Sequence, residues 1–159
     1  MKSLGLIGGT GLDHWGKAVR HHPMETDYGA PSAEVAEFKT AGIRLLFLPR
    51  HGARHQFPPH AVNYRANADA LRQLEVDGIV AVNAVGGISE GMGPGRLVIP
   101  DQLIDYTWGR AHTFSSGADD ALLHVEFARP FDGSLRRGLL EAAAASGCVV
   151  NVKKGQFLA

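Results

Sequence analysis

Residues 4–11, which read LGLIGGTG, decide the fold. A short apolar run that stops at a cluster of glycines is typical of a buried strand that carries a loop at its carboxyl end. Glycines let the backbone approach a ligand closely, and such a loop can present N–H groups and the Thr10 hydroxyl to an anion. A tight turn after the strand explains the glycines equally well. In either case we expect this strand to belong to the central sheet.

Strand and helix signals alternate along the rest of the chain. Apolar runs predict further strands at residues 34–38, 43–48, 78–82, 97–104, where Pro100 interrupts the run, and from 149 onward. Capping residues predict two helices, at residues 63–75 and 135–146. This alternation indicates an α/β fold with a mixed central sheet and flanking helices. In such folds ligands collect beyond the carboxyl ends of the strands.

Length and composition indicate one globular domain. The 159 residues, 45% of them hydrophobic, suffice for the core of one domain and are too few for two domains of ordinary size. No repeat or linker divides them, so we expect residues 1–159 to form a single domain. Because the chain stops where a strand should pass to more sheet, we expect this domain to be partial and its sheet incomplete at the C-terminus.

Charge and cysteine usage restrict the partners. Sixteen basic residues balance sixteen acidic ones, so we expect neither nucleic acid nor an anionic membrane as partner. The apolar run at the N-terminus is too short for a signal peptide, and no later run could span a bilayer. The single cysteine, Cys148, fits a reducing compartment. These features favour a soluble cytoplasmic protein that binds a small molecule or another protein.

A second loop with candidate ligands follows the predicted strand at 43–48. Its residues 50–55 read RHGARH. The Arg50 guanidinium can donate two parallel hydrogen bonds to a phosphate, and His51 can donate another. A solvated basic turn is one alternative, and a metal site is another, made by His51, His55 and His60. Glycine and prolines argue against the helix that such a metal site needs, and no carboxylate lies beside it, so we expect no metal.

A third glycine loop, NAVGGIS at residues 83–89, again follows a predicted buried strand. Asn83 offers an amide donor, and the paired glycines permit unusual backbone geometry. A plain connection from strand to turn is the alternative. Three such loops, each at the end of a predicted strand, favour an anion site more than any one of them does.

Two nucleotide motifs fail on particular positions. Residues 11–18 read GLDHWGKA and nearly match a P-loop, but Ala18 replaces the serine or threonine whose hydroxyl would hold magnesium. No G-x-G-x-x-G register can be drawn through residues 8–16. A generic nucleotide-binding module is therefore disfavoured.

Five motifs in order resemble those of the methylthioadenosine and methylthioinosine phosphorylases, which belong to the purine nucleoside phosphorylase family. They are IGGTGL at 7–12, PRHG at 49–52, VNYRAN at 62–67, NAVGG at 83–87 and DQLID at 101–105. The resemblance runs from residue 4 to about 150 and covers only the N-terminal part of a family member. Residues 151–159 do not resemble the expected continuation, so the resemblance implies a C-terminally truncated member.

The resemblance implies a reaction in purine salvage. Inorganic phosphate, a co-substrate, attacks C1′ of a 5′-methylthio purine nucleoside and releases the purine base and 5-methylthioribose 1-phosphate. It implies a pentosyltransferase that needs no metal and no organic cofactor, and it suggests a homotrimer.

The resemblance also assigns residues. The phosphate ligands of the family match Thr10, Arg50, His51, Asn83 and the backbone at Ala84. Ala84 further resembles a residue that lines the ribose. His124 resembles a histidine that reaches the methylthio pocket of a neighbouring subunit, with an ordinary surface histidine as the alternative. The groups that act on the leaving purine lie beyond residue 159 in the family, so the catalytic residues stay unknown.

Two hypotheses follow, from different classes. The first is a phosphorylase of 5′-methylthio purine nucleosides, with the thioinosine branch slightly favoured by the NAVGG loop. The second is a truncated, inactive fragment that retains only the phosphate-binding loops. Phosphate-dependent release of the base distinguishes them.

Overall fold

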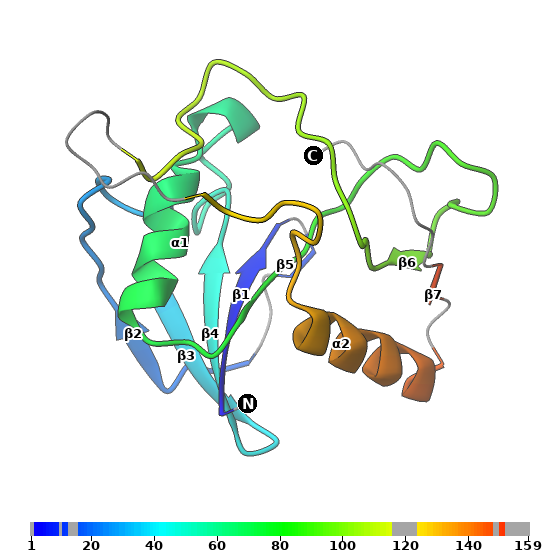
Figure 1. Cartoon of the computed structure of the whole chain (residues 1–159). Helices are drawn as coiled ribbons and strands as arrows, with labels where there is room; N and C mark the ends of the chain where they lie inside the picture. The colour runs from blue at the N-terminus through cyan, green and yellow to red at the C-terminus, as the bar shows by residue number, and fades with distance from the viewer. Residues whose placement is uncertain (1, 10, 13–15, 116–123, 148–149, 152–159) are drawn as a thin grey trace. The chain divides into compact units, whose positions relative to one another are not determined.

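A computed structural model of the chain describes residues 2–9, 11–12, 16–115, 124–147 and 150–151 (Figure 1). The chain forms two compact units, one of residues 1–84 with 110–116 and the other of residues 85–109 with 117–159. That residues 1–159 make a single domain stays a prediction. Within the described ranges, no helix is long and apolar enough to cross a membrane.

The first unit is built on a five-stranded sheet with the order β2-β3-β4-β1-β5. Its strands are β1 (Ser3–Gly8), β2 (Arg20–His22), β3 (Val35–Thr40), β4 (Ile43–Pro49) and β5 (Ile79–Ala81). β1 pairs in parallel with β4 and β5, whereas β3 runs antiparallel to β2 and β4. The predicted mixed sheet is confirmed. β2 was not predicted because its sequence, RHH, has no apolar pattern.

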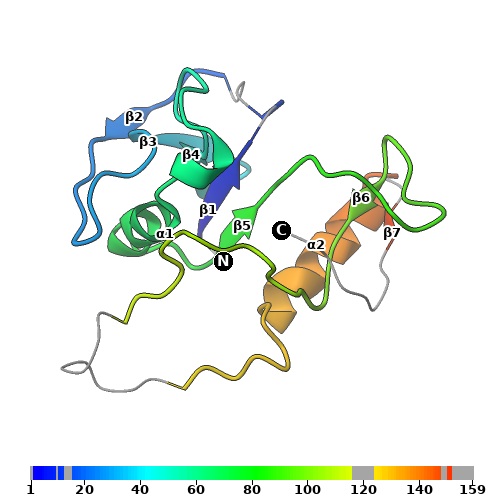
Figure 2. The ribbon, with the colours of Figure 1, turned by 90° about the horizontal axis from the view of Figure 1, so that it is seen from above.

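One helix covers a face of this sheet. After β4 the chain makes a short 3-10 helix, η1 (Pro59–Ala61), and then α1 (Tyr64–Gln73), which leads to β5. The Asn63 side chain accepts a hydrogen bond from the Ala66 N–H at 3.1 Å, so Asn63 caps α1 as predicted. Two views show α1 lying along the sheet (Figures 1 and 2).

The core has two layers because β4 sends alternate side chains to opposite faces of the sheet. Leu46 and Leu48 pack with Leu71 of α1 on one face, whereas Leu45 and Phe47 pack with Leu6 on the other. Gly5 lies under the helix, where an added Cβ would come within 3.0 Å of the Leu71 side chain. A glycine in β1 therefore lets α1 pack closely on the sheet.

The second unit holds α2 (Gly133–Ala145) and the parallel pair β6 (Leu97–Val98) and β7 (Val150–Asn151). The Asp132 side chain caps α2 by accepting from the Leu135 N–H at 2.7 Å, as predicted. The strand predicted over 97–104 is too long. Pro100 has no N–H, and its carbonyl accepts a hydrogen bond from the Arg136 side chain at 2.9 Å.

A nearly buried charge cluster ties three strands together. The Glu37 carboxylate on β3 contacts His22 Nε2 on β2 at 2.8 Å and Arg44 Nε on β4 at 3.2 Å. Only 12% of the Glu37 side chain is exposed. The hydrogen bond from His22, together with Arg44, holds the pKa of the Glu37 carboxyl below its ordinary value, against the opposing effect of burial.

We expect Leu71→Ala to lower the free energy of unfolding by about 2–5 kcal/mol, because it leaves a cavity in the layer between α1 and β4. Urea denaturation measures the change. Ile88→Ala is the matched control, since Ile88 is 88% exposed and its truncation should cost less than about 0.5 kcal/mol. Equal effects of the two changes would contradict this packing.

We expect Glu37→Gln to destabilise the fold by about 1.5–3 kcal/mol at neutral pH, the range for hydrogen bonds to a charged group. Folding lowers the pKa of Glu37. Its contribution to the free energy of unfolding is therefore fully present above the carboxyl pKa of the unfolded chain, about 4.3, and is lost as the pH falls through the lower pKa of the folded chain. The variant should therefore lose less stability on acidification. Denaturation at several pH values measures this, with Glu34→Gln, whose side chain is 59% exposed, as control. A parallel pH dependence in both variants would refute the role of Glu37.

Candidate functional site

Three loops leave the same edge of the first unit's sheet. Because β1 is parallel to both of its neighbours, the carboxyl ends of β1, β4 and β5 lie together. The pairing sets Gly8 beside Pro49 and Ile7 beside Ala81. Hydrogen bonds continue past the strand ends, from the Arg50 N–H to the Gly8 carbonyl at 2.8 Å and from the Val82 N–H to the Ile7 carbonyl at 2.9 Å. The three predicted loops therefore start side by side.

The Arg50 guanidinium lies against the backbone of Gly9. A Cβ added to Gly9 would come within 2.7 Å of Arg50 Nη2 and within 3.7 Å of the Val82 carbonyl oxygen. The side chain from the β4 loop and the backbone from the β5 loop thus meet at the loop that follows β1. A side chain at position 9 would therefore require the guanidinium to move.

The His51 ring is held from both sides. Its Nδ1 lies 2.8 Å from the Phe57 carbonyl oxygen, and its Nε2 lies 3.4 Å from Arg50 Nε. The Phe57 N–H donates in turn to the His51 carbonyl at 3.0 Å, which closes the loop into a ring. A guanidinium and a fixed imidazole at adjacent positions make a cationic corner beside Gly9, a suitable place for an oxyanion.

The metal alternative for this loop finds no support in its geometry. His51 and His55 stack with their ring centroids 6.0 Å apart, and His55 has a left-handed backbone, with φ of 53°, rather than a helical one. Nowhere in the described part of the chain do three or more His, Cys, Asp or Glu side chains gather in a way that could hold a metal ion. That the protein works without a metal stays a prediction.

The other predicted residues lie as follows. Asn83 and Ala84 are exposed and follow β5 at the same sheet edge as Arg50. Thr10 lies outside the described residues, between Gly9 and Gly11. His124 is exposed and belongs to the second unit. The structure thus brings Arg50, His51 and the loop of Asn83 to one edge of one unit.

The VNYRAN motif at 62–67 holds two neighbouring segments in place. The Asn63 amide donates to the Tyr28 carbonyl at 2.8 Å, and the buried Asn67 exchanges hydrogen bonds with Ser32 at 2.7 and 3.0 Å. These contacts fix residues 28–32 against the start of α1. The two asparagines therefore serve the structure of the first unit.

The arginine of the same motif fixes residues 110–114. Arg65 Nη1 donates to the Thr113 carbonyl at 3.2 Å, and its guanidinium lies 5.1 Å from the ring centroid of Tyr28. Arg110 returns the contact by lying 4.3 Å from the centroid of the Tyr64 ring. Such cation–π pairs stabilise exposed segments modestly. The motif thus fastens a distant part of the chain onto α1.

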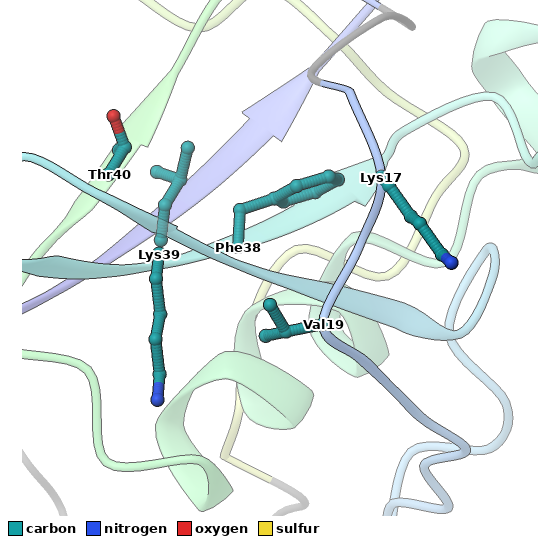
Figure 3. Close-up of a pocket in the computed structure, with 6 residues that line it drawn as sticks. Lys17, Val19, Phe38, Lys39 and Thr40 are labelled. Carbon is teal, nitrogen blue, oxygen red and sulfur yellow. The ribbon is translucent and has the colours of Figure 1, made fainter.

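The first unit also has a separate hollow (Figure 3). It is lined by Lys17, Val19, Phe38, Lys39, Thr40 and Leu45. Thr40 pairs with Ile43 at the first residue of β4, so this hollow lies toward the amino end of β4, whereas Arg50 follows its carboxyl end. Basic and apolar residues share its wall without the hydrogen-bonded arrangement seen around Arg50. We therefore place the candidate site at the loops.

Comparison with known proteins relates this chain to one protein family. The family model of the phosphorylase superfamily matches residues 3–159. A probable S-methyl-5′-thioinosine phosphorylase of Pseudomonas syringae is 48% identical over 145 residues, which are 90% of this chain and 59% of that protein. An S-methyl-5′-thioadenosine phosphorylase of Pyrococcus abyssi is 43% identical over 158 residues, which are 99% of this chain and 60% of that protein.

Solved structures give the same fold. Methylthioadenosine phosphorylase from Schistosoma mansoni superposes with a TM-score of 0.91 at 32% identity, both in its apo form and in its complex with tubercidin. The match covers 99% of this chain, 63% of the apo chain and 62% of the tubercidin-bound chain. A complex of that enzyme with adenine gives a TM-score of 0.89 at 34% identity. The chain thus spans about 60% of the length of the relatives it matches.

We expect Gly9→Ala to weaken binding of phosphate by roughly tenfold, which is about 1.4 kcal/mol, because the new methyl group displaces the Arg50 guanidinium. Isothermal titration calorimetry measures the affinity. Gly133→Ala is the control, since an added Cβ there meets nothing within 4 Å. Unchanged phosphate affinity in a folded Gly9→Ala variant would show that phosphate binding does not depend on the close approach of Arg50 to Gly9.

Proposed function

We propose that this chain, which belongs to the phosphorylase superfamily, takes part in the phosphorolysis of 5′-methylthio purine nucleosides. In this reaction an oxygen of inorganic phosphate bonds to C1′ of the ribosyl group while the bond from C1′ to the purine breaks. The products are the free base and 5-methylthioribose 1-phosphate. The observation that carries the proposal is the corner that Arg50 and His51 make against Gly9 at the ends of parallel strands.

Arg50 and His51 would hold and orient the phosphate. The guanidinium can donate two parallel hydrogen bonds to an oxyanion, and Gly9 lets it sit against the backbone. Holding the phosphate beside the ribosyl carbon converts a bimolecular encounter into a positioned one. The anionic nucleophile also faces the positive charge that develops on the sugar as the base departs. Positioning and electrostatics therefore supply this part of the catalysis.

Thr10, Asn83 and the backbone at Ala84 complete the proposed phosphate site, and Ala84 would also line the ribose. Asn83 and Ala84 follow β5, whose pairing with β1 supports this assignment. Asn83 is exposed, which leaves its amide available as a donor. Thr10 is assigned from its place in the loop that follows β1.

The proposed substrate is S-methyl-5′-thioinosine, with methylthioadenosine as the second candidate. The relative from Pseudomonas syringae is 48% identical and carries the thioinosine name, whereas the one from Pyrococcus abyssi is 43% identical and carries the thioadenosine name. We further propose a homotrimer in which His124 reaches the methylthio group bound by a neighbouring subunit. The exposure of His124 is compatible with that role.

The proposal is tested by phosphate-dependent release of base from each nucleoside by the purified chain. We expect Arg50→Ala to reduce the rate by at least about a hundredfold, the loss that follows removal of one electrostatic donor. Arg54→Ala, an exposed arginine of the same loop, should leave the rate unchanged. Chromatography of the released hypoxanthine or adenine measures the rate and identifies the base.

Other outcomes are equally informative. Release that proceeds without phosphate would make the protein a hydrolase and contradict the proposal. Phosphate binding without release, in a folded sample, would favour the second hypothesis, a chain that keeps the phosphate loops and lacks catalysis.

A further inference from the structure

We propose that the anion site binds its ligand together with one proton, which His51 takes up on Nε2. The inference rests on the proposed phosphate site and specifies the charge state in which that site works. It follows from the two contacts that fix the His51 ring and from what each partner can donate or accept.

The first contact decides where the proton of the neutral ring lies. Nδ1 of His51 is 2.8 Å from the Phe57 carbonyl oxygen. A carbonyl oxygen only accepts hydrogen bonds, so Nδ1 must carry the hydrogen. A neutral imidazole has a single N–H, and that N–H is used here.

The second contact gives the same answer independently. Nε2 of His51 lies 3.4 Å from Arg50 Nε. The guanidinium nitrogen only donates, so Nε2 must be the acceptor in this long hydrogen bond. In the neutral form of His51 a lone pair therefore faces the side where Arg50 offers its own donors.

An anion at Arg50 changes what is needed at Nε2. A sulfate oxygen, or a phosphate oxygen that carries no hydrogen, only accepts hydrogen bonds when it lies beside the guanidinium, and a lone pair on Nε2 would repel it. One proton from solvent, placed on Nε2, turns the repulsion into a charge-assisted hydrogen bond while Nδ1 keeps its bond to Phe57. The proton returns to solvent when the anion leaves.

The groups around the ring favour coupling between the anion and the proton. Arg50 and His55 are two ionisable side chains that contact the His51 ring, the latter with its ring centroid 6.0 Å away. Neither supplies negative charge, and no ion pair joins His51 to a carboxylate among the residues that the structure describes. The bound anion would therefore supply the negative charge that a protonated ring beside Arg50 requires.

Sulfate is the suitable probe because it stays a dianion across the neutral pH range, whereas phosphate itself changes charge. We expect the dissociation constant of sulfate to rise with pH, by up to about tenfold per pH unit, since only the form with a proton on Nε2 binds. Calorimetry in two buffers of different ionisation enthalpy should report uptake of close to one proton. The full 159-residue chain is used throughout.

Two variants assign the proton to its residue. His51→Gln offers an amide donor at any pH, so its sulfate affinity should hardly change with pH. His55→Gln, beside it in the same loop, should keep the pH dependence of the unaltered chain. Should His51→Gln fail to fold, nitrogen NMR of the unaltered chain reads the ring directly, with hydrogen on Nδ1 alone before sulfate is added and on both nitrogens after.

Each opposite result has its own meaning. Sulfate binding that is independent of pH, or a ring that stays neutral in the complex, would overturn the proton uptake and leave the phosphate site standing. A folded chain that binds neither sulfate nor phosphate would overturn the site itself, and with it both proposals.

Discussion

The parallel pairing of β1 with β4 on one side and β5 on the other is the constraint on which the rest of the first unit depends. It sets the carboxyl ends of these three strands at one edge of the sheet, so the loops that follow them are neighbours although they are far apart in the sequence. It also requires a crossover from β4 to β5, which α1 supplies, and the apolar face of α1 then closes one layer of the core. Core and candidate site are therefore two results of one pairing.

Residues of the motifs divide into those that we propose bind phosphate and those that hold neighbouring segments in place. Arg50 and His51 form a cationic corner. In contrast, the side chains of Asn63, Arg65 and Asn67 form hydrogen bonds with neighbouring segments of the chain. These three residues affect the candidate site indirectly, because they fix the start of α1, which follows the Arg50 loop in the sequence. A motif that recurs in a family is thus not by itself a list of ligands.

Much of the fold and part of the candidate site could be predicted from the sequence, because the sequence patterns that identify them are local. The apolar run before Gly8 and the caps at Asn63 and Asp132 identify their elements by periodicity and side-chain chemistry. The end of β6 was missed because a side chain from α2 takes the Pro100 carbonyl. Arg50 and His51 were candidates by residue type, but the fit of Gly9 to the guanidinium depends on strand register, which composition does not reveal.

The link between His51 and Phe57 has a consequence for how such proteins diverge. The group that orients the imidazole is a main-chain carbonyl, and the return bond uses a main-chain N–H. Selection on this contact therefore acts on the path of the chain and not on the identity of residue 57. Most substitutions there preserve it, and proline, which has no N–H, is the residue that removes half of it. A position can thus vary freely among homologues and still take part in the chemistry of its neighbour.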